Sequence, residues 1–294
     1  MEIYREDVRR IMREGVDRED RTGVGSRFIF GIYNEFFMQN GFPIVTSKYT
    51  RFRSILAELL WFMAGDSDEG NLRKLGCKIW QSNAEDPRWQ MKARFPGDVG
   101  RNYGVQWRSW NDPNGKIDQL YRAIEMIKEK PNDRRNLVTA WNPGELDQTA
   151  LPPCHVLYQF SVSADRLSVG MYQRSCDFFL GVPFNISSYA LLLHLVAQFT
   201  LLIPDKLAIM FGDSHIYRNQ FKETEELLRP ERQPFPLPHL WINPEIKGLG
   251  DVDGIYHEML RRVDNGEKPG QLLDGVAHLK DYRHHSAIKA PMAV

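Results

Sequence analysis

Three cysteines make a thiol the first candidate for chemistry in this chain of 294 residues. Cys77, Cys154 and Cys176 are odd in number and lack a CxxC spacing, which fits neither a disulfide framework nor a zinc site. Cys154 follows Pro152-Pro153 at the start of an expected strand, where proline confines the backbone and can hold the thiol at the strand end. A nucleophile is one interpretation. The other is a small buried apolar residue, the commoner fate of a lone cysteine.

Arginines next to hydroxyl-bearing or glycine residues are candidates for holding a phosphate, because the guanidinium fork matches its oxygens. They occur in Arg21-Thr22-Gly23, Arg134-Arg135 and Arg174-Ser175. Each alone is also explained as solvated charge or as half of a surface ion pair. His215 and Tyr217, in GDSHIY, suit a sugar hydroxyl or simply fill a strand end.

Glu58 is a carboxylate inside the apolar run SILAELLWFM, on a helix otherwise fit for complete burial. An isolated buried charge is costly, so Glu58 should have a partner or a purpose. A structural ion pair and a role in proton transfer are both open.

The composition excludes several classes of protein. With 38 basic and 38 acidic residues, no global field attracts nucleic acid or an anionic membrane, so any anion must be held locally. The apolar stretch from Ala190 is interrupted by His194 and Gln198, which argues against a membrane segment. The N-terminus lacks the apolar run of a secretory signal, so we expect a cytoplasmic protein, or one in the host cytoplasm if the source is viral.

The elements that must position these residues mix helices and strands. Apolar periodicity predicts helices at 2–15, at 54–64 with Ser54 as its cap, at 117–130 and at about 186–202. Strands are expected at 136–141, 155–162, 167–174 and 207–211, with the middle two forming a hairpin. One α+β domain over 1–294 is the economical interpretation, with the loop-rich segment 83–100 as an insertion.

Several segments together resemble the thymidylate synthase family: DRTG at Asp20, ELLWF at Glu58, YGVQWR at Tyr103, PPCH around Cys154, and YQRSCDFFLGVPFNISSYALL from Tyr172. GDSHIY and the C-terminal IKAPMAV extend the resemblance end to end. It implies that family's α+β fold, a mixed sheet packed by helices, and a homodimer joined sheet to sheet.

The resemblance implies the substrates, dUMP and 5,10-methylenetetrahydrofolate as co-substrate, with no metal and no nucleic acid required. Arg21, Arg174 and Ser175 would hold the phosphate together with Arg134 and Arg135 of the other subunit. His215 and Tyr217 would hold the deoxyribose hydroxyl. The residues expected around the folate are Lys48, Ser54, Ile79, Trp80, Asp177, Leu180, Gly181, Phe184, Ala293 and Val294.

The chemistry implied by the resemblance is attack of the Cys154 thiolate on C6 of uracil, which makes C5 nucleophilic, with Arg174 favouring the thiolate. Glu58 and Tyr103 would move protons. Asn185 would bind the uracil edge, because an amide can both donate to O4 and accept from N3–H. The full expected catalytic set is Cys154, Glu58, Tyr103, Arg174, Asn185, Asp177 and His155.

Two products are possible. Hydride from tetrahydrofolate gives dTMP and dihydrofolate, whereas water gives 5-hydroxymethyl-dUMP and tetrahydrofolate. Gln81 stands where synthases usually have Asp, and Arg101-Asn102 where they usually have Pro-Val, as in segments of phage hydroxymethylases. Asn102 could hold a water near the reacting carbon, or the change could be ordinary drift. We expect the synthase, with the hydroxymethylase as the alternative and a non-catalytic nucleotide- or RNA-binding relative as a remote third.

Overall fold

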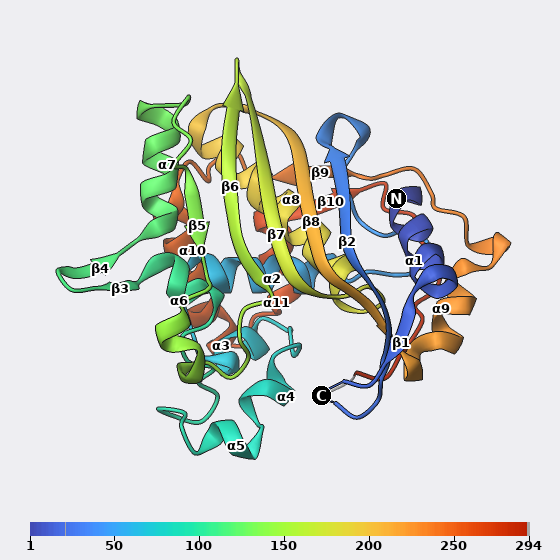
Figure 1. Cartoon of the computed structure of the whole chain (residues 1–294). Coiled ribbons are helices and arrows are strands. Elements are labelled where there is room, and N and C mark those ends of the chain that lie inside the picture. The colour runs from blue at the N-terminus through green and yellow to red at the C-terminus, as the bar shows by residue number, and fades with distance from the viewer. Residues whose placement is uncertain (21, 293–294) are drawn as a thin grey trace.

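The computed structural model describes residues 1–20 and 22–292 and has a six-stranded mixed sheet at its centre (Figure 1). The strand order is β1-β2-β8-β7-β6-β5, and every neighbouring pair is antiparallel except β7 and β8. Parallel neighbours require a crossover, and here helix α8 supplies it. The strands are β1 (Val16–Arg18), β2 (Ser26–Phe37), β5 (Leu137–Thr139), β6 (His155–Ser163), β7 (Arg166–Asp177) and β8 (Ile203–Tyr217).

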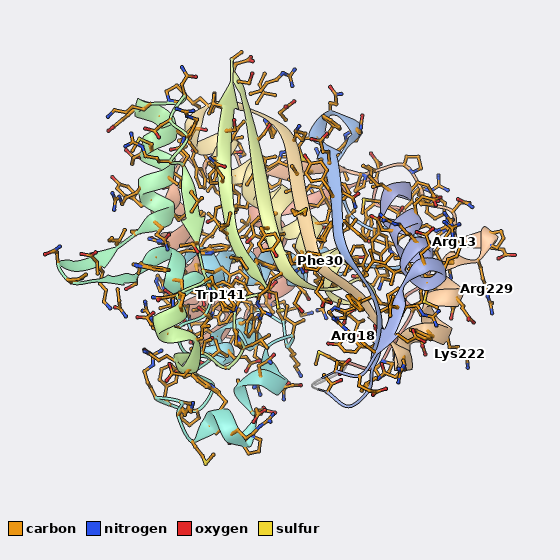
Figure 2. The ribbon with its side chains drawn as sticks, viewed as in Figure 1. Arg13, Arg18, Phe30, Trp141, Lys222 and Arg229 are labelled. Carbon is orange, nitrogen blue, oxygen red and sulfur yellow. The ribbon has the colours of Figure 1, made fainter. Side chains whose placement is uncertain are left out.

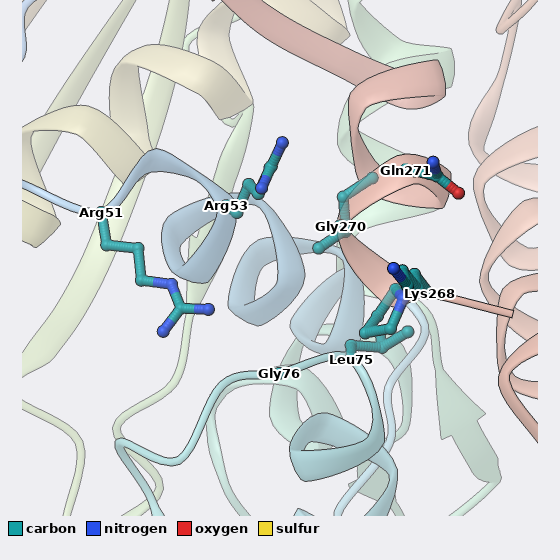
Figure 3. Close-up of a pocket in the computed structure, with 9 residues that line it drawn as sticks. Arg51, Arg53, Leu75, Gly76, Lys268, Gly270 and Gln271 are labelled. Atoms are coloured by element: carbon teal, nitrogen blue, oxygen red, sulfur yellow. The ribbon is translucent and has the colours of Figure 1, made fainter. Parts of the chain in front are cut away.

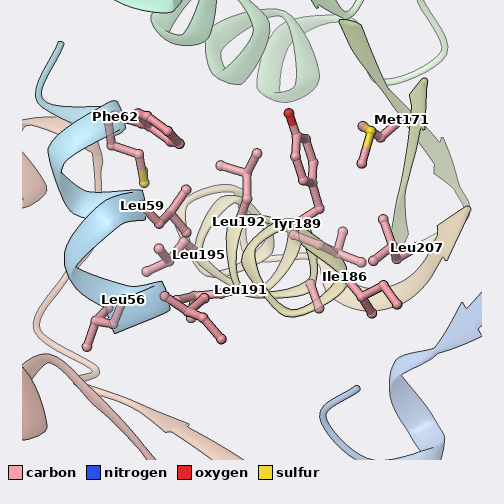
Figure 4. Packing of buried hydrophobic residues seen from close by; sticks show 14 of the residues in the cluster. Leu56, Leu59, Phe62, Met171, Ile186, Tyr189, Leu191, Leu192, Leu195 and Leu207 are labelled. Atoms are coloured by element: carbon pink, nitrogen blue, oxygen red, sulfur yellow. The ribbon is translucent and has the colours of Figure 1, made fainter. Parts of the chain in front are cut away.

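Helix α8 (Gly181–Thr200) is the centre of the hydrophobic core. It lies between the sheet and helix α2 (Phe52–Met63), so that Leu191 and Leu195 meet Leu56 and Leu59 of α2 (Figure 4). Both helices are apolar on nearly every side, as expected of helices that are buried all round. α8 is long and apolar enough to cross a bilayer, but 78% of its apolar window is buried inside the fold, as in the core helix of a globular protein.

The remaining elements surround this core (Figure 1). The two small hairpins are β3 (Trp110–Asp112) with β4 (Gly115–Ile117), and β9 (His239–Ile242) with β10 (Ala277–Lys280). The 3-10 turns are η1 (Met38–Asn40), η2 (Pro143–Gln148), η3 (Arg218–Gln220) and η4 (Pro230–Arg232). The helices are α1 (Glu2–Glu14), α3 (Glu69–Lys74), α4 (Gln81–Ala84), α5 (Pro87–Gln90), α6 (Tyr103–Arg108), α7 (Gln119–Glu129), α9 (Phe221–Leu228), α10 (Leu249–Asp264) and α11 (Pro269–Val276).

The sheet face turned away from α8 carries a row of apolar side chains across four strands, which ends at Thr139 on the fifth. Tyr33 pairs with Met210, Met210 with Tyr172, Tyr172 with Leu157, and Leu157 with Thr139. Tyr33 is 58% exposed and Met210 42%. Phe30, also on β2, is 71% exposed (Figure 2). Contiguous apolar surface of this kind marks an interaction face.

The structure confirms the mixed α+β sheet, the hairpin of β6 and β7, and the four predicted helices, but it corrects their ends. Ser54 does not cap α2, because the helix begins at Phe52 after Arg51 and Ser54 is buried within it. α8 begins at Gly181, five residues before the predicted start. The 83–100 segment contains the short helix α5, which Asp86 caps through the amide of Arg88.

Candidate active site

Cys154 lies in the loop that enters β6, and Arg174 of β7 fixes that loop. The Arg174 guanidinium donates to the carbonyl oxygens of Pro152 and Pro153, both at 2.8 Å, and its backbone amide donates to the Cys154 carbonyl at 2.8 Å. Its Nη2 lies 4.0 Å from the Cys154 sulfur. A cation at this distance favours the thiolate over the thiol. The same guanidinium lies over the Trp141 ring at 5.2 Å, near the end of β5 (Figure 2).

Tyr103 holds the loop from the other side, because its hydroxyl accepts a hydrogen bond of 2.7 Å from the Cys154 amide. Tyr103 begins α6, which packs closely on α2: a Cβ on Gly104 would lie 2.5 Å from the Phe62 carbonyl oxygen. Glycine is therefore required for this approach. Burial raises the pKa of Tyr103 well above its usual value, so the hydroxyl keeps its proton.

The buried carboxyl of Glu58 has a hydrogen-bond partner, as expected, and that partner is the uncharged side chain of Trp80. Trp80 Nε1 donates to Glu58 Oε1 at 2.7 Å, and no described residue forms an ion pair with this carboxylate. Burial raises the pKa of Glu58 to about 7, and the Trp80 bond opposes only part of that rise. A carboxyl poised near neutrality can both give and take a proton, and among the described residues Glu58 has no cation with which to form a structural ion pair.

His155 and Asn185 lie together behind Cys154. Gln173 Nε2 donates to Asn185 Oδ1 at 2.9 Å, and His155 pairs with Gln173 across β6 and β7. Burial lowers the pKa of His155 to about 4, and its hydrogen bond with Asn185 only partly offsets this. The imidazole is therefore neutral at physiological pH. Gln173 was missed by the sequence reasoning, although it stands one residue before the arginine that was found.

Asp177 organises the entrance to α8, where the predicted folate residues Leu180, Gly181 and Phe184 begin the helix. Its Oδ1 accepts from the amides of Phe179 at 3.0 Å and Leu180 at 2.9 Å. Its Oδ2 accepts from Gln220 Nε2 at 3.4 Å, and the same nitrogen donates to the Pro291 carbonyl at 3.2 Å. The described end of the C-terminal segment therefore lies against this site. Ala293 and Val294 lie outside the described residues.

Lys48 reaches the same place from a separate segment of chain. Its Nζ donates to the Phe179 carbonyl and lies 3.9 Å above the Phe179 ring. Burial lowers the pKa of Lys48 to about 8, with Asp177 opposing the change. Lys48 thus brings a positive charge to the start of α8. Among the other predicted folate residues, Trp80 is buried beside Glu58, Ile79 is 38% exposed, and Ser54 is buried in α2.

The sugar and phosphate candidates lie on the strands beside Cys154. His215 stands next to Asp177 in the sheet register, its Nδ1 lies 2.9 Å from Asp213 Oδ1, and its ring lies edge to face with Tyr217 at 4.9 Å. Ser175 pairs with Asp213 on the same two strands. Arg21 lies outside the described residues.

Arg134 and Arg135, among the residues that the structure describes, lie away from the Cys154 of their own chain. The Arg134 carbonyl accepts from Gln159 Nε2, and Gln159 is five residues farther along β6 than Cys154. At 3.3 Å per residue this places the pair roughly 16 Å away. Both side chains are exposed, and the Arg135 guanidinium is held by Asp133.

The residues that depart from the family pattern form hydrogen bonds or ion pairs within the fold. Asn102 is fully buried; its Oδ1 accepts from the Val105 amide as the cap of α6, and its Nδ2 donates to the Asp66 carbonyl. Gln81 donates to Glu85. Arg101 pairs with Glu145 at 2.7 Å. These contacts use one of the two donor hydrogens and one of the two acceptor sites of the Asn102 amide, so the idea that Asn102 holds a reactive water stays a prediction.

A cavity of about 300 Å³ opens at the N-terminus of α2, three residues from Lys48 (Figure 3). Arg51, Arg53 and Lys268 give it three cations, of which Arg53 pairs with Asp274 at 2.5 Å. The remaining positive charge suits an anionic group. Among residues 1–20 and 22–292 no cluster of His, Cys, Asp or Glu has the arrangement to hold a metal ion.

The mixed sheet packed by helices, with a thiol, an arginine and a buried carboxyl near one end of it, has the form of an α+β enzyme. A comparison with protein-family models matches residues 2–294, essentially the whole chain, to the family described as thymidylate synthase. The chain belongs to the thymidylate synthase family. It is thus a folate-dependent transferase that acts on C5 of dUMP with methylenetetrahydrofolate as co-substrate.

Proposed function

We propose that the chain is a thymidylate synthase, which converts dUMP and methylenetetrahydrofolate into dTMP and dihydrofolate. The observation that carries the proposal is the position of Cys154, whose sulfur lies 4.0 Å from the Arg174 guanidinium while its amide is bound by Tyr103. In this arrangement the thiolate attacks C6 of uracil, and the ring becomes an enolate whose C5 attacks the folate's one-carbon unit.

Proton movement in this reaction falls to Glu58 and Tyr103. Glu58, with its pKa near 7, exchanges protons with the pyrimidine, while Tyr103 stays protonated beside Cys154. His155 remains neutral and helps to hold Asn185. Asn185 then offers its amide to the uracil edge, which favours dUMP over dCMP because cytosine presents a donor where uracil has O4.

The phosphate and the folate occupy the two sides of Cys154 in this proposal. Arg174 and Ser175 of β7, with Arg21, bind the phosphate. His215 and Tyr217 bind the sugar hydroxyl. The pterin stacks near Trp80 and the start of α8, where Asp177 and Lys48 supply polar contacts.

The active unit is a homodimer in which each site takes Arg134 and Arg135 from the partner. Two features support this. The open sheet face carries the apolar row from Tyr33 to Leu157, which a second copy would cover. In addition, Arg134 and Arg135 are exposed and remote from the Cys154 of their own chain. A sheet-to-sheet dimer would let them reach the other site.

The choice of dTMP over 5-hydroxymethyl-dUMP rests on the exclusion of water from the exocyclic methylene intermediate. Asn102 is fully buried, caps α6 and binds the Asp66 carbonyl, and Gln81 is bound to Glu85, so both residues have structural contacts that account for their presence in a dry site. The C-terminal segment, held at Pro291 by Gln220, lies where it can cover the site.

The test is incubation of the protein with dUMP and methylenetetrahydrofolate, with dihydrofolate followed by absorbance and the nucleotide product by mass. A methylated nucleotide with one dihydrofolate per turnover is expected. A hydroxymethylated nucleotide without dihydrofolate would replace the synthase by the hydroxymethylase. No change in the nucleotide would exclude both.

A further inference from the structure

The indole ring of Trp141 covers one face of the Arg174 guanidinium. The guanidinium carbon lies 5.2 Å from the ring centroid, within the roughly 6 Å at which a ring face attracts a cation. Trp141 follows β5 and Arg174 lies on β7, while β6 stands between these two strands in the sheet. The contact therefore reaches across the strand that Cys154 precedes.

The ring restrains the guanidinium in the direction that its hydrogen bonds leave open. The group is planar and its N–H donors lie in that plane. Nε donates to the Pro153 carbonyl and Nη2 to the Pro152 carbonyl, both at 2.8 Å, and Nη2 also lies 4.0 Å from the Cys154 sulfur. These contacts lie along one edge of the plane, so they do not by themselves stop the plane from tilting about that edge. A ring packed against its face opposes the tilt.

The backbone of Trp141 is itself tied to the strand that follows the nucleophile. β6 shifts its register with β7 at Val156, two residues after Cys154, as at a β-bulge. The Val156 carbonyl accepts from the amides of Ala140 and Trp141, at 2.9 and 3.3 Å. It also accepts from the Thr139 hydroxyl at 3.1 Å. Bulges beside active sites commonly re-aim side chains, and this one fixes Trp141 relative to Cys154 over a short path.

Arg174 brings a positive charge to the sulfur, whereas three other titratable groups around Cys154 stay neutral. Burial raises the pKa of Tyr103 well above its usual value and likewise raises the pKa of the Cys176 thiol. Burial lowers the pKa of His155 to about 4. All three are therefore uncharged in the range in which a cysteine thiol ionises. Because Coulomb attraction falls with distance, the ionisation of Cys154 depends on how closely the guanidinium is held to it.

We propose that Trp141 is a positioning residue for the nucleophile: its ring holds the Arg174 guanidinium at the Cys154 sulfur and so favours the thiolate. The inference rests on the proposed role of Cys154 in attack on C6 of uracil. It explains how one arginine serves two anions, since the proposed phosphate contact would otherwise draw the guanidinium away from the sulfur. With Trp141 in place, the phosphate meets an arginine whose position is already fixed.

The test is the pH profile of Cys154 alkylation by iodoacetamide in the nucleotide-free protein, followed by peptide mass. Trp141→Leu should raise the pH midpoint by about half a unit, while the limiting rate at high pH stays within about twofold of wild type. Trp141→Phe keeps a ring face and should restore most of the wild-type midpoint. A trifluorinated tryptophan in place of Trp141 keeps the shape of the indole but weakens the negative potential of its face, so the midpoint should rise there too.

Trp241→Leu is the matched control, because it removes a partly buried indole that stacks on His278 at 4.6 Å in the β9–β10 hairpin. Its midpoint should equal that of wild type. The fluorinated variant keeps the test decisive if Trp141→Leu does not fold.

A wild-type midpoint in the fluorinated variant would overturn the proposal. So would alkylation slowed by the same factor at every pH, because that would mean altered access to the thiol only. The profile needs neither dUMP nor folate. A wild-type protein that leaves dUMP unchanged would therefore refute the proposed function, while the midpoints would still decide the role of Trp141.

Discussion

The guanidinium of Arg174 lies 4.0 Å from the sulfur of Cys154 while it also clamps the carbonyls of Pro152 and Pro153. One side chain therefore both places the thiol and favours its ionised form. Lysine would keep the charge but could not bind two carbonyls and approach the sulfur with the same rigid fork.

Arg174→Lys is therefore expected to lower kcat/KM for dUMP on the order of 100-fold. It should also slow alkylation of Cys154 by iodoacetamide at pH 7, measured by peptide mass. Cys77 and Cys176 are buried and should not react. Arg166→Lys is the control, because Arg166 lies on the same strand but forms an ion pair with Asp205 at the surface. Equal alkylation rates in wild type and Arg174→Lys would remove the arginine from thiolate formation.

Glu58 should make the protein less stable as the pH rises. Its pKa is raised from 4.5 in the unfolded chain to about 7 in the fold, so the folded state holds its proton more tightly. The stability gained from that proton is fully present below pH 4.5 and is lost as the pH rises through 7. Glu58→Gln should therefore match wild type at pH 4 and exceed it by about 3 kcal/mol at pH 8.

Denaturant unfolding at several pH values measures this difference. Glu267→Gln, at an exposed ion pair with Arg262, should not show the same gain. A glutamine side chain in place of Glu58 cannot exchange protons, so the variant should also lose turnover at every pH. A stability difference that does not depend on pH would contradict the raised pKa.

The proposed exchange of arginines predicts complementation between two inactive proteins. In a homodimer of Cys154→Ala both active sites lack the nucleophile. In a homodimer of the double variant Arg134→Ala/Arg135→Ala both sites lack the partner's arginines. After random exchange of subunits, half the dimers are mixed, and each mixed dimer contains one site with a native cysteine and native arginines. Activity should therefore return to about a quarter of wild type after unfolding and refolding the two proteins together. A mixture no more active than its separate components would refute shared sites.

Asn185→Asp should shift base preference from dUMP toward dCMP. The Asn185 Oδ1 is already bound by Gln173, and a carboxylate in its place would accept from cytosine but could not donate to uracil O4. The ratio of kcat/KM for dUMP to that for dCMP should fall about 100-fold or more. Asn185→Ala is the control, since it should lose dUMP activity without gaining dCMP. An unchanged ratio would place base selection elsewhere.

Much of the fold could be predicted from apolar periodicity. α1, α2, α7 and α8 have strong helical patterns, and β6 and β7 alternate around a short turn. The helix ends were predicted less accurately: Ser54 has the side chain of a cap, but the packing of Phe52 into the core starts α2 earlier. Strand β2 was not predicted, because its sequence SRFIFGIYNEFF places apolar side chains on both faces of the sheet. Gly31, at a positive φ of 83°, also interrupts the alternation of apolar and polar residues.

The sequence could mark candidate residues for the site, but not the contacts that connect them. Local sequence could mark Glu58 as an anomaly because a carboxylate stood in an apolar helix, yet its partner Trp80 lies 22 residues away. The supporting roles of Gln173, Gln220 and Trp141 depend on contacts between distant segments. Asn102 carried a polar signal that suggested chemistry, and the sequence did not indicate that it also caps a helix.

The most direct test of the central claim, attack by Cys154 on C6 and transfer of the folate carbon to C5, uses 5-fluoro-dUMP. Fluorine at C5 cannot leave as a proton does, so the reaction should stop with protein, nucleotide and folate joined covalently. Mass spectrometry of the intact protein and its peptides should find one nucleotide and one folate carried by Cys154, and none on Cys154→Ser. An unmodified protein, or an adduct on any other residue, would contradict the account.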